Sequence, residues 1–466
     1  MRGALAAAAA SVEEAISVTP AHVDARANVI SLPRQPRAAR ADPNALVDPD
    51  ALVDPHALAA VRSAALGTAW SALWRSRLLI WVAGCLAASV LGTAPGLVRR
   101  FDPTGISTSF GSVGNVLAAP AVRGDAIWYL RIAQSGYHTA AATRFFPLYP
   151  LLVRAGSWLT GSLTVAGILI SLAAVLVGLL IIHRLTVLEL GARVANLTIE
   201  LIAFGPLALF LSAVYTESLF LALSAGTFYA ARRGRWATAG ALGGLAALTR
   251  VTGVLLVVPV LILFLYGPRT DAEPVKPQLR FMPRYRLTPA VLWTALIPAG
   301  TAVFSVYLTL RGYRPTAFLT AQSRFTHHVP ALPVVAVWDA AQMAWQELRL
   351  GFSGVVGFAS QTQSVVGMIA LGAAVVALTG VFRRLPLAYG LFILVGLLVP
   401  LSSPTVGDPL KGLARYETVL FPLYMAAAAW AIERGTRRPL LLGFAALGIF
   451  FTAQFATWHI VGSQLL

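Results

Sequence analysis

Long apolar stretches recur along this chain from about residue 78 to its end, and they constrain the fold more than any other feature. A helix of about 20 apolar residues crosses the hydrocarbon core of a bilayer while satisfying its own backbone hydrogen bonds. Charged residues make up only 12% of the chain, against roughly 25% in an average soluble domain. The sequence therefore predicts an all-α polytopic membrane protein.

We expect about eleven transmembrane segments. Several are shorter than a straight crossing needs, so those at 217–231 and 237–249 are expected to be tilted, broken or re-entrant. The expected segments are 78–97, 162–183, 194–213, 217–231, 237–249, 251–266, 288–310, 364–380, 386–402, 416–432 and 439–458.

Short arginine clusters between these segments set the expected orientation. RRGR at 232–235, the arginines of 280–286, and Arg383 with Arg384 mark cytoplasmic loops, because such loops carry an excess of Lys and Arg. The net charge of +17 thus reflects topology and anionic lipid headgroups. The arginines form no continuous stripe, which argues against nucleic acid as a partner. We expect a multi-pass plasma-membrane protein with a cytoplasmic N-terminus.

Residues 1 to about 65 are expected to form a disordered cytoplasmic tail, followed by one transmembrane domain over 66–466. The tail contains a six-residue repeat, DPNALV-DPDALV-DPHALA, which is typical of low-complexity sequence. Cys85 is the only cysteine and lies in an apolar stretch, so neither a disulfide framework nor a thiolate metal site is expected.

The first extracytoplasmic loop, 98–161, carries an isolated carboxylate. Asp125 begins an aromatic-rich helical stretch, DAIWYLRIAQS, that ends at Gly136. Asp is a preferred helix N-cap and Gly a preferred helix stop, so Asp125 is either a cap, a catalytic group or both. A second amphipathic stretch, RFFPLYPLLVRAGSWL, has prolines that can open a helix. We therefore expect two amphipathic interface helices in this loop.

Together these helices are expected to present Asp125 next to a group of substrate-binding side chains. A carboxylate beside a surface of low dielectric constant tends toward a raised pKa, nearer the working range of a general base. The expected neighbours are Tyr129, Tyr137, His138 and Arg144.

The stretch GDAIWYLRIAQSGY…RFFPLYPLLVR resembles the signature of the GPI mannosyltransferase II (PIG-V) family and its bacterial relatives. FGPLALFLSAVYTESLFLALSAGTFYAARRGRW, GLAALTRVTGVLLV and LARYETVLFPLY are similar to later blocks of the family, in the same order, from about residue 75 to 435. Two positions depart from the pattern: Gly124 replaces a Trp, and HTAAATR lacks a Glu. These departures leave the acceptor open.

The resemblance implies a polyprenol-dependent glycosyltransferase of the GT-C class with its active site on the extracytoplasmic side. Asp125 would be the general base of an inverting transfer. The donor, polyprenyl-phosphate mannose, would be a substrate, and no cofactor is expected. The acceptor would be a glycolipid, a glycan or a protein, and membrane lipids would be the other partners.

Two charged residues near span ends are further candidates for substrate binding. Glu217, in VYTES, could contact sugar hydroxyls, pair with an arginine or cap a helix. Arg250 lies between two apolar half-spans, where an unpaired guanidinium is costly. It is expected to pair with an acid such as Glu217 or to bind a phosphate, for which a guanidinium is well suited.

A small basic cluster precedes the penultimate span. Lys411 and Arg415, beside Tyr416, either bind the donor phosphate or extend their charges to the membrane surface. His327 and His328 could contact sugar or phosphate, but two adjacent histidines without a third ligand do not indicate a metal site.

The leading hypothesis is thus an inverting membrane mannosyltransferase. One alternative keeps the reaction and changes the sugar to arabinose or glucose. The other is a lipid or solute transporter in which Asp125 only caps a helix. No inverted repeat of hydropathy is visible, which disfavours the transporter.

Overall fold

The computed structural model describes residues 55–92, 96, 98, 102–107, 109–275, 282–326, 329–350 and 363–457. The chain divides into two units, Met1–Ala45 and Leu46–Leu466, and all described residues belong to the second. Apart from an isolated bridge between Thr405 and Asp408, they contain no β-structure. The all-α architecture is confirmed.

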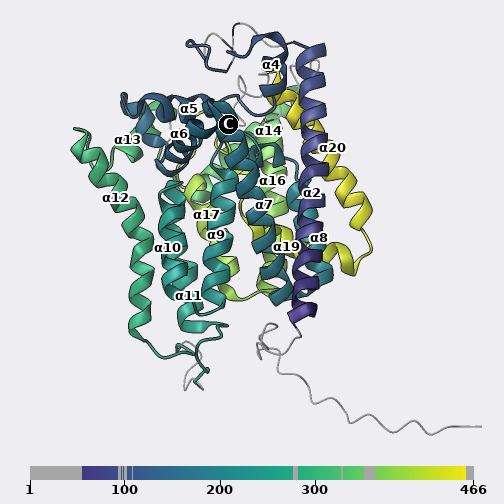
Figure 1. The fold of residues 1–466 in the computed structure, drawn as a ribbon, viewed down its shortest axis with the longest axis vertical. Helices are drawn as coiled ribbons and strands as arrows, with labels where there is room; N and C mark the ends of the chain where they lie inside the picture. The colour runs from purple at the N-terminus through teal and green to yellow at the C-terminus, as the bar shows by residue number, and fades with distance from the viewer. Residues whose placement is uncertain are drawn as a thin grey trace, which may run out of the picture. The chain divides into compact units, whose positions relative to one another are not determined.

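The helices, including the 3-10 helices labelled η, follow one another along the chain (Figure 1). They are α2 (Pro55–Val90), α4 (Gly111–Ala118), α5 (Ala126–Ser135), η1 (Ala140–Arg144), α6 (Leu148–Thr160), α7 (Leu163–Leu190), α8 (Ala192–Ala203), η2 (Ala208–Leu211), α9 (Glu217–Arg232), α10 (Trp236–Ala247), η3 (Val251–Leu256), α11 (Val257–Tyr266), η4 (Pro289–Ala295), α12 (Leu296–Leu310), α13 (Ala317–Thr326), α14 (Pro333–Leu350), α16 (Gln363–Arg384), α17 (Leu387–Leu401), α18 (Leu413–Glu417), α19 (Phe421–Glu433) and α20 (Arg437–Ala456).

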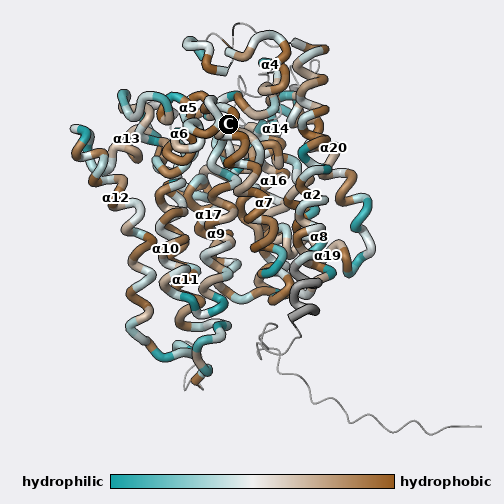
Figure 2. The backbone as a smooth tube through the Cα atoms, in the orientation of Figure 1, coloured by the Kyte–Doolittle hydropathy of each residue, from teal (hydrophilic) through white to brown (hydrophobic). Residues whose placement is uncertain are grey.

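Several of these helices are long and apolar enough to cross a membrane. Hydrophobic residues run along their length, as Figure 2 shows. Every expected span overlaps at least one helix, and the chain is an integral membrane protein. In the described part of the chain the five membrane-length segments are Ala65–Val90, Leu163–Leu190, Pro289–Leu310, Gln363–Arg384 and Arg437–Ala456, with shorter apolar helices at Val251–Tyr266 and Leu387–Leu401.

The first span differs from its expected bounds. Helix α2 begins at Pro55 and ends at Val90, shortly before Gly92 with its φ of 70°. The boundaries 78–97 for the span were therefore wrong, since the membrane-length segment runs from Ala65 to Val90. The tail boundary near residue 65 stays a prediction, and residues 1–54 lie outside the described part. Arg75 and Arg77 make the middle of the helix look too polar for a membrane, yet Arg77 is buried at 7% exposure.

Helix α2 accommodates the charge of Arg77 because the guanidinium donates hydrogen bonds at the break between α8 and η2. The expected span 194–213 is not one helix: α8 ends at Ala203, and η2 begins only at Ala208. Arg77 Nη2 donates to the carbonyl of Ala203 at 2.7 Å, and Nη1 donates to the carbonyl of Ala208 at 2.7 Å and to Ser212 Oγ at 2.9 Å. Carbonyls left free by a helix end need such partners when they are buried.

We expect Arg77→Met to destabilise the protein by roughly 3 kcal/mol, because it leaves buried carbonyls without donors. Thermal unfolding of the purified protein in detergent measures the effect. Arg75→Met is the matched control, since Arg75 lies on the same helix and is exposed; its melting temperature should stay at the wild-type value. Equal melting temperatures for both variants would contradict the capping role.

Other short spans keep or break their helices for local reasons. Segments 217–231 and 237–249 are the continuous helices α9 and α10, which pack against each other. Segment 416–432 is divided into α18 and α19 by residues 418–420. The break at 418–420 keeps α18 at the end of the bundle where the loop helices lie.

Both expected helices of the first loop are present as α5 and α6, which lie together beside the beginning of α7 (Figure 1). Helix α5 stops at Gly136, whose φ of 86° few other residues adopt. Helix α6 begins directly after Pro147, which occupies the N-cap. The additional helix α4 was not expected, because its sequence, GSVGNVLA, is rich in glycine.

Candidate functional site

A cavity of about 950 Å³ opens where the loop helices meet the helical bundle. Its charged lining residues come from distant parts of the chain: Asp125, Arg144, Arg250, Lys411 and Arg415. Apolar side chains from η3, α17 and the residues before α19 complete it, among them Leu255, Phe392, Val395, Val399 and Leu420. The cavity therefore combines a strongly charged surface with an apolar one.

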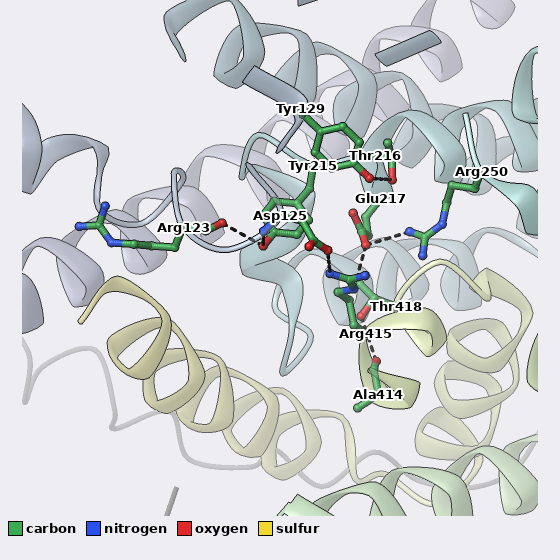
Figure 3. Close-up of polar contacts among 10 residues, drawn as sticks. All are labelled: Arg123, Asp125, Tyr129, Tyr215, Thr216, Glu217, Arg250, Ala414, Arg415 and Thr418. Atoms are coloured by element: carbon green, nitrogen blue, oxygen red, sulfur yellow. Dashed lines mark hydrogen bonds and ion pairs between the residues drawn. The ribbon is translucent and has the colours of Figure 1, made fainter. Parts of the chain in front are cut away.

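Backbone contacts hold Asp125 at this cavity. Gly124, with a φ of 59°, turns the chain just before it, and this left-handed conformation is easy for glycine. The Asp125 N–H donates to the Tyr215 hydroxyl at 2.9 Å, and that hydroxyl donates to the Arg123 carbonyl at 3.0 Å (Figure 3). Asp125 occupies the N-cap position of α5, but its side chain makes no capping hydrogen bond. The alternative in which its carboxylate caps the helix was therefore wrong.

The carboxylate of Asp125 instead enters an ion-pair network. Arg415 Nη1 donates to Asp125 Oδ2 at 2.8 Å, and Arg415 Nε lies 3.3 Å from Glu217 Oε1. Arg250 Nη1 donates to the same Glu217 oxygen at 2.8 Å. Figure 3 shows Arg415 between the two acids. Pairing of Arg250 with an acid is confirmed.

The charges around Asp125 reverse the expected shift of its pKa. Burial acts to raise the pKa, but Arg415, Arg144 and Lys411 together outweigh burial and lower the pKa below its ordinary value. The raised pKa expected from the sequence was therefore wrong. Asp125 is therefore ionised at neutral pH and able to accept a proton, and its contact with Arg415 limits how strong a base it is.

Two cations at the cavity differ from Arg415 and Arg250, because in the described part of the chain they form no ion pair with an acid. Within the described residues, neither Arg144 nor Lys411 forms an ion pair or a side-chain hydrogen bond. Arg144 lies over the rings of Trp128 and Phe145, with its guanidinium carbon 5.2 and 4.8 Å from their centroids. Two cations thus face the cavity in excess, beyond the two that Asp125 and Glu217 balance.

Burial also shifts the pKa values of Lys411 and of its neighbour Asp408. It lowers the pKa of Lys411 and raises the pKa of Asp408 to about 6. Asp408 is not a lining residue of the cavity. The charge of Asp408 acts on Lys411 from outside the cavity lining.

The other expected substrate-binding residues divide by position. Tyr129 and Tyr416 line the cavity, and the Tyr416 ring lies under both Arg250 and Arg415, with 5.1 and 5.6 Å between guanidinium carbon and ring centroid. Tyr137 does not line it, because its hydroxyl donates to the Phe145 carbonyl at 2.8 Å in the core. His138 is exposed, away from the cavity lining, and bonds the Ser135 carbonyl.

Three more of the expected residues lie outside the cavity lining or outside the described part of the chain. Glu217 is 1% exposed and does not line the cavity; it lies behind Arg250 and Arg415. His327 and His328 lie outside the described residues. Among the residues that the structure does describe, no group of three or more His, Cys, Asp or Glu is arranged to hold a metal ion.

Two site residues were not anticipated. Tyr215 holds the backbone of Asp125, and Trp128 supports Arg144 from below. Tyr215 stands in the VYTES block, two residues before Glu217, so proximity to that block was the available signal. Nothing local in the sequence indicates the contact between Trp128 and Arg144, because 15 residues and a turn separate them.

Residues 103–266 match the family model described as mannosyltransferase (PIG-V). This segment contains Asp125, Arg144, Glu217 and Arg250. The resemblance expected from the sequence is confirmed for this part of the chain. No curated protein matches the chain.

Solved structures similar to the chain include the oligosaccharyltransferase of Archaeoglobus fulgidus tethered with an acceptor peptide, at 12% identity and a TM-score of 0.38. The match covers 83% of this chain and 55% of that one. The archaeal oligosaccharyltransferase from the same organism, in complex with an inhibitory peptide and a dolichol-phosphate, has 14% identity and a TM-score of 0.36. That match covers 82% of this chain and 55% of the other. The chain spans about half the length of these structures.

Proposed function

We propose that this protein is an inverting membrane mannosyltransferase, which moves mannose from polyprenyl-phosphate mannose to an acceptor hydroxyl. One observation carries the proposal: an ionised carboxylate, Asp125, shares a cavity with Arg144 and Lys411, two cations that form no ion pair in the described part of the chain. The apolar side chains of the same cavity suit a polyprenyl chain. The match of residues 103–266 to a mannosyltransferase family supports mannose as the sugar.

The reaction assigns one task to each charged group. Asp125 takes the proton from the acceptor hydroxyl as its oxygen attacks the anomeric carbon of mannose. The bond between that carbon and the phosphate oxygen breaks, and the polyprenyl phosphate leaves with one more negative charge. Arg144 and Lys411 stabilise this charge as it develops, which lowers the barrier more than it strengthens donor binding. Arg250 was expected to share this task, but its pairing with Glu217 assigns it to positioning.

The extracytoplasmic side of the plasma membrane is the proposed location of the reaction. Helix α9 begins with Glu217 near the cavity and ends at Arg232, and α16 ends at Arg383 and Arg384. These arginines lie in the last turns of α9 and α16, away from the site. The positive-inside rule favours the cytoplasmic side for such basic helix ends.

The donor can be tested with purified protein in lipid nanodiscs. Labelled polyprenyl-phosphate mannose, arabinose and glucose are each offered with a membrane lipid extract as the acceptor source. We expect a new mannosyl glycosidic bond from the mannose donor at least about tenfold faster than from the others. Preferred transfer of arabinose or glucose would replace mannose in the proposal. Net flux of the donor across proteoliposomes without any new glycosidic bond would contradict transferase function.

A further inference from the structure

Arg415 is the only residue of the described site that contacts both carboxylates. It is 8% exposed and lies 2.8 Å from Asp125 Oδ2 and 3.3 Å from Glu217 Oε1. The two acids therefore share one guanidinium, each through a different nitrogen. Because Glu217 is also 2.8 Å from Arg250, the strength of its hold on Arg415 depends on a second arginine.

The hydrogen bonding between Arg415 and Glu217 is incomplete. Among the described residues, Arg415 Nε and Glu217 Oε2 are buried atoms without a hydrogen-bond partner. Buried polar atoms normally have partners, and a guanidinium and a carboxylate satisfy each other best through two parallel hydrogen bonds. Arg415 thus has an unused bonding arrangement with Glu217.

We propose that Glu217 is a positioning residue, which acts through Arg415 to set how firmly the Asp125 carboxylate is held. This inference rests on the proposed function of Asp125 as the base. When Glu217 draws Arg415 toward itself, the contact with Asp125 loosens, and Asp125 becomes a stronger proton acceptor. Substrate contact is the rival role for Glu217, but its side chain does not line the cavity.

Several other charged and titratable groups face Asp125 and remain unchanged in the test. Arg144 and Lys411 both attract its carboxylate. Asp408, with a pKa raised to about 6, faces Lys411. The groups around Asp125 come from several elements of the described fold. They are Tyr129 in α5, Arg144 in η1, Tyr215 before α9, Glu217 at the start of α9, Arg250 before η3, Lys411 before α18 and Arg415 in α18.

A double-mutant cycle tests the inference. In transfer assays we expect Glu217→Gln to lower kcat about tenfold with little change in the KM of the donor, because Asp125 becomes a weaker base. In an Arg415→Gln background, Glu217→Gln should cause no further loss, since the residue through which it acts is gone. Arg415→Met, which also removes the charge, serves as the background if Arg415→Gln does not fold. Losses that multiply, or a raised donor KM, would overturn the inference.

An infrared titration gives a readout that needs no turnover. The carboxyl band of Asp125 is the one that disappears in Asp125→Asn. Its pKa should fall by about half a unit or more in Glu217→Gln, and should not change when the same substitution is made in the Arg415→Gln background. An equal fall in both backgrounds would overturn the inference. A protein that shows the predicted pKa pattern but transfers no sugar would contradict the proposed function instead.

Glu417→Gln is the matched control. Glu417 is a neighbouring acid in α18, but among the described residues it forms no ion pair with Arg415 or Asp125, and it does not act on the pKa of Asp125. This variant should leave kcat and the pKa of Asp125 at their wild-type values. A shift as large as that of Glu217→Gln would show that any nearby buried acid has the same effect, and would overturn the specific role of Glu217.

Discussion

Replacing Asp125 by Asn is expected to lower mannose transfer by roughly a thousandfold, because the general base is lost while the shape of the side chain is kept. The amide takes no proton from the acceptor hydroxyl. The backbone of position 125 should remain in place, since the Tyr215 hydroxyl accepts its N–H. Initial rates of the purified variant in nanodiscs measure the effect.

Asp339→Asn is the control for this substitution. Asp339 is an exposed carboxylate on α14, outside the cavity lining, so its rate should equal that of the wild type. Normal turnover of Asp125→Asn would contradict a catalytic role for Asp125. Such a result would leave its ion pair with Arg415 as its role.

The second large effect concerns Arg144 and Lys411, the two cations at the cavity that form no ion pair in the described part of the chain. The combined substitution Arg144→Gln and Lys411→Gln is expected to lower kcat/KM about a hundredfold or more, since both charges stabilise the leaving phosphate. Each single substitution should account for part of that loss. Inhibition of transfer by the product, polyprenyl phosphate, should weaken in parallel, because the product carries the charge that these residues bind.

Arg154→Gln is the matched control, since Arg154 is an exposed arginine on α6 in the same loop. It removes the same charge without removing a lining residue of the cavity. Unchanged product inhibition in the Arg144 and Lys411 double variant would contradict phosphate binding by these two residues. A loss in kcat/KM without that change would mean that they position the acceptor.

Hydrophobicity alone was enough to predict most of the helices. It failed where a buried charge, or the free carbonyls at a helix break, found hydrogen-bond partners far away in the sequence. Arg77 made α2 look too short, because nothing near it in sequence reveals that the carbonyls of Ala203 and Ala208 bind its guanidinium. The same pairing hid the break after α8. Local turn chemistry was more informative: Gly136 and Pro147 mark the helix ends that they were expected to mark.

The site shows the same division. The pattern around Asp125 identified the carboxylate, and the cost of an unpaired guanidinium predicted a partner for Arg250. The sequence could not show that Arg415, 290 residues after Asp125, binds its carboxylate. Together with the charges of Arg144 and Lys411, this contact reverses the pKa shift expected from burial alone. It also determines which cations remain for a phosphate: Arg144 and Lys411, in place of Arg250 and Arg415.

A structure of the Asp125→Asn variant with polyprenyl-phosphate mannose tests the central claim most directly, because the variant binds the donor without consuming it. We predict that the phosphate lies within hydrogen-bond distance of Arg144 and Lys411, with position 125 facing the anomeric carbon and the polyprenyl chain along the apolar side chains of α17. A phosphate bound outside this cavity, or a sugar on the far side of the phosphate from position 125, would contradict the account.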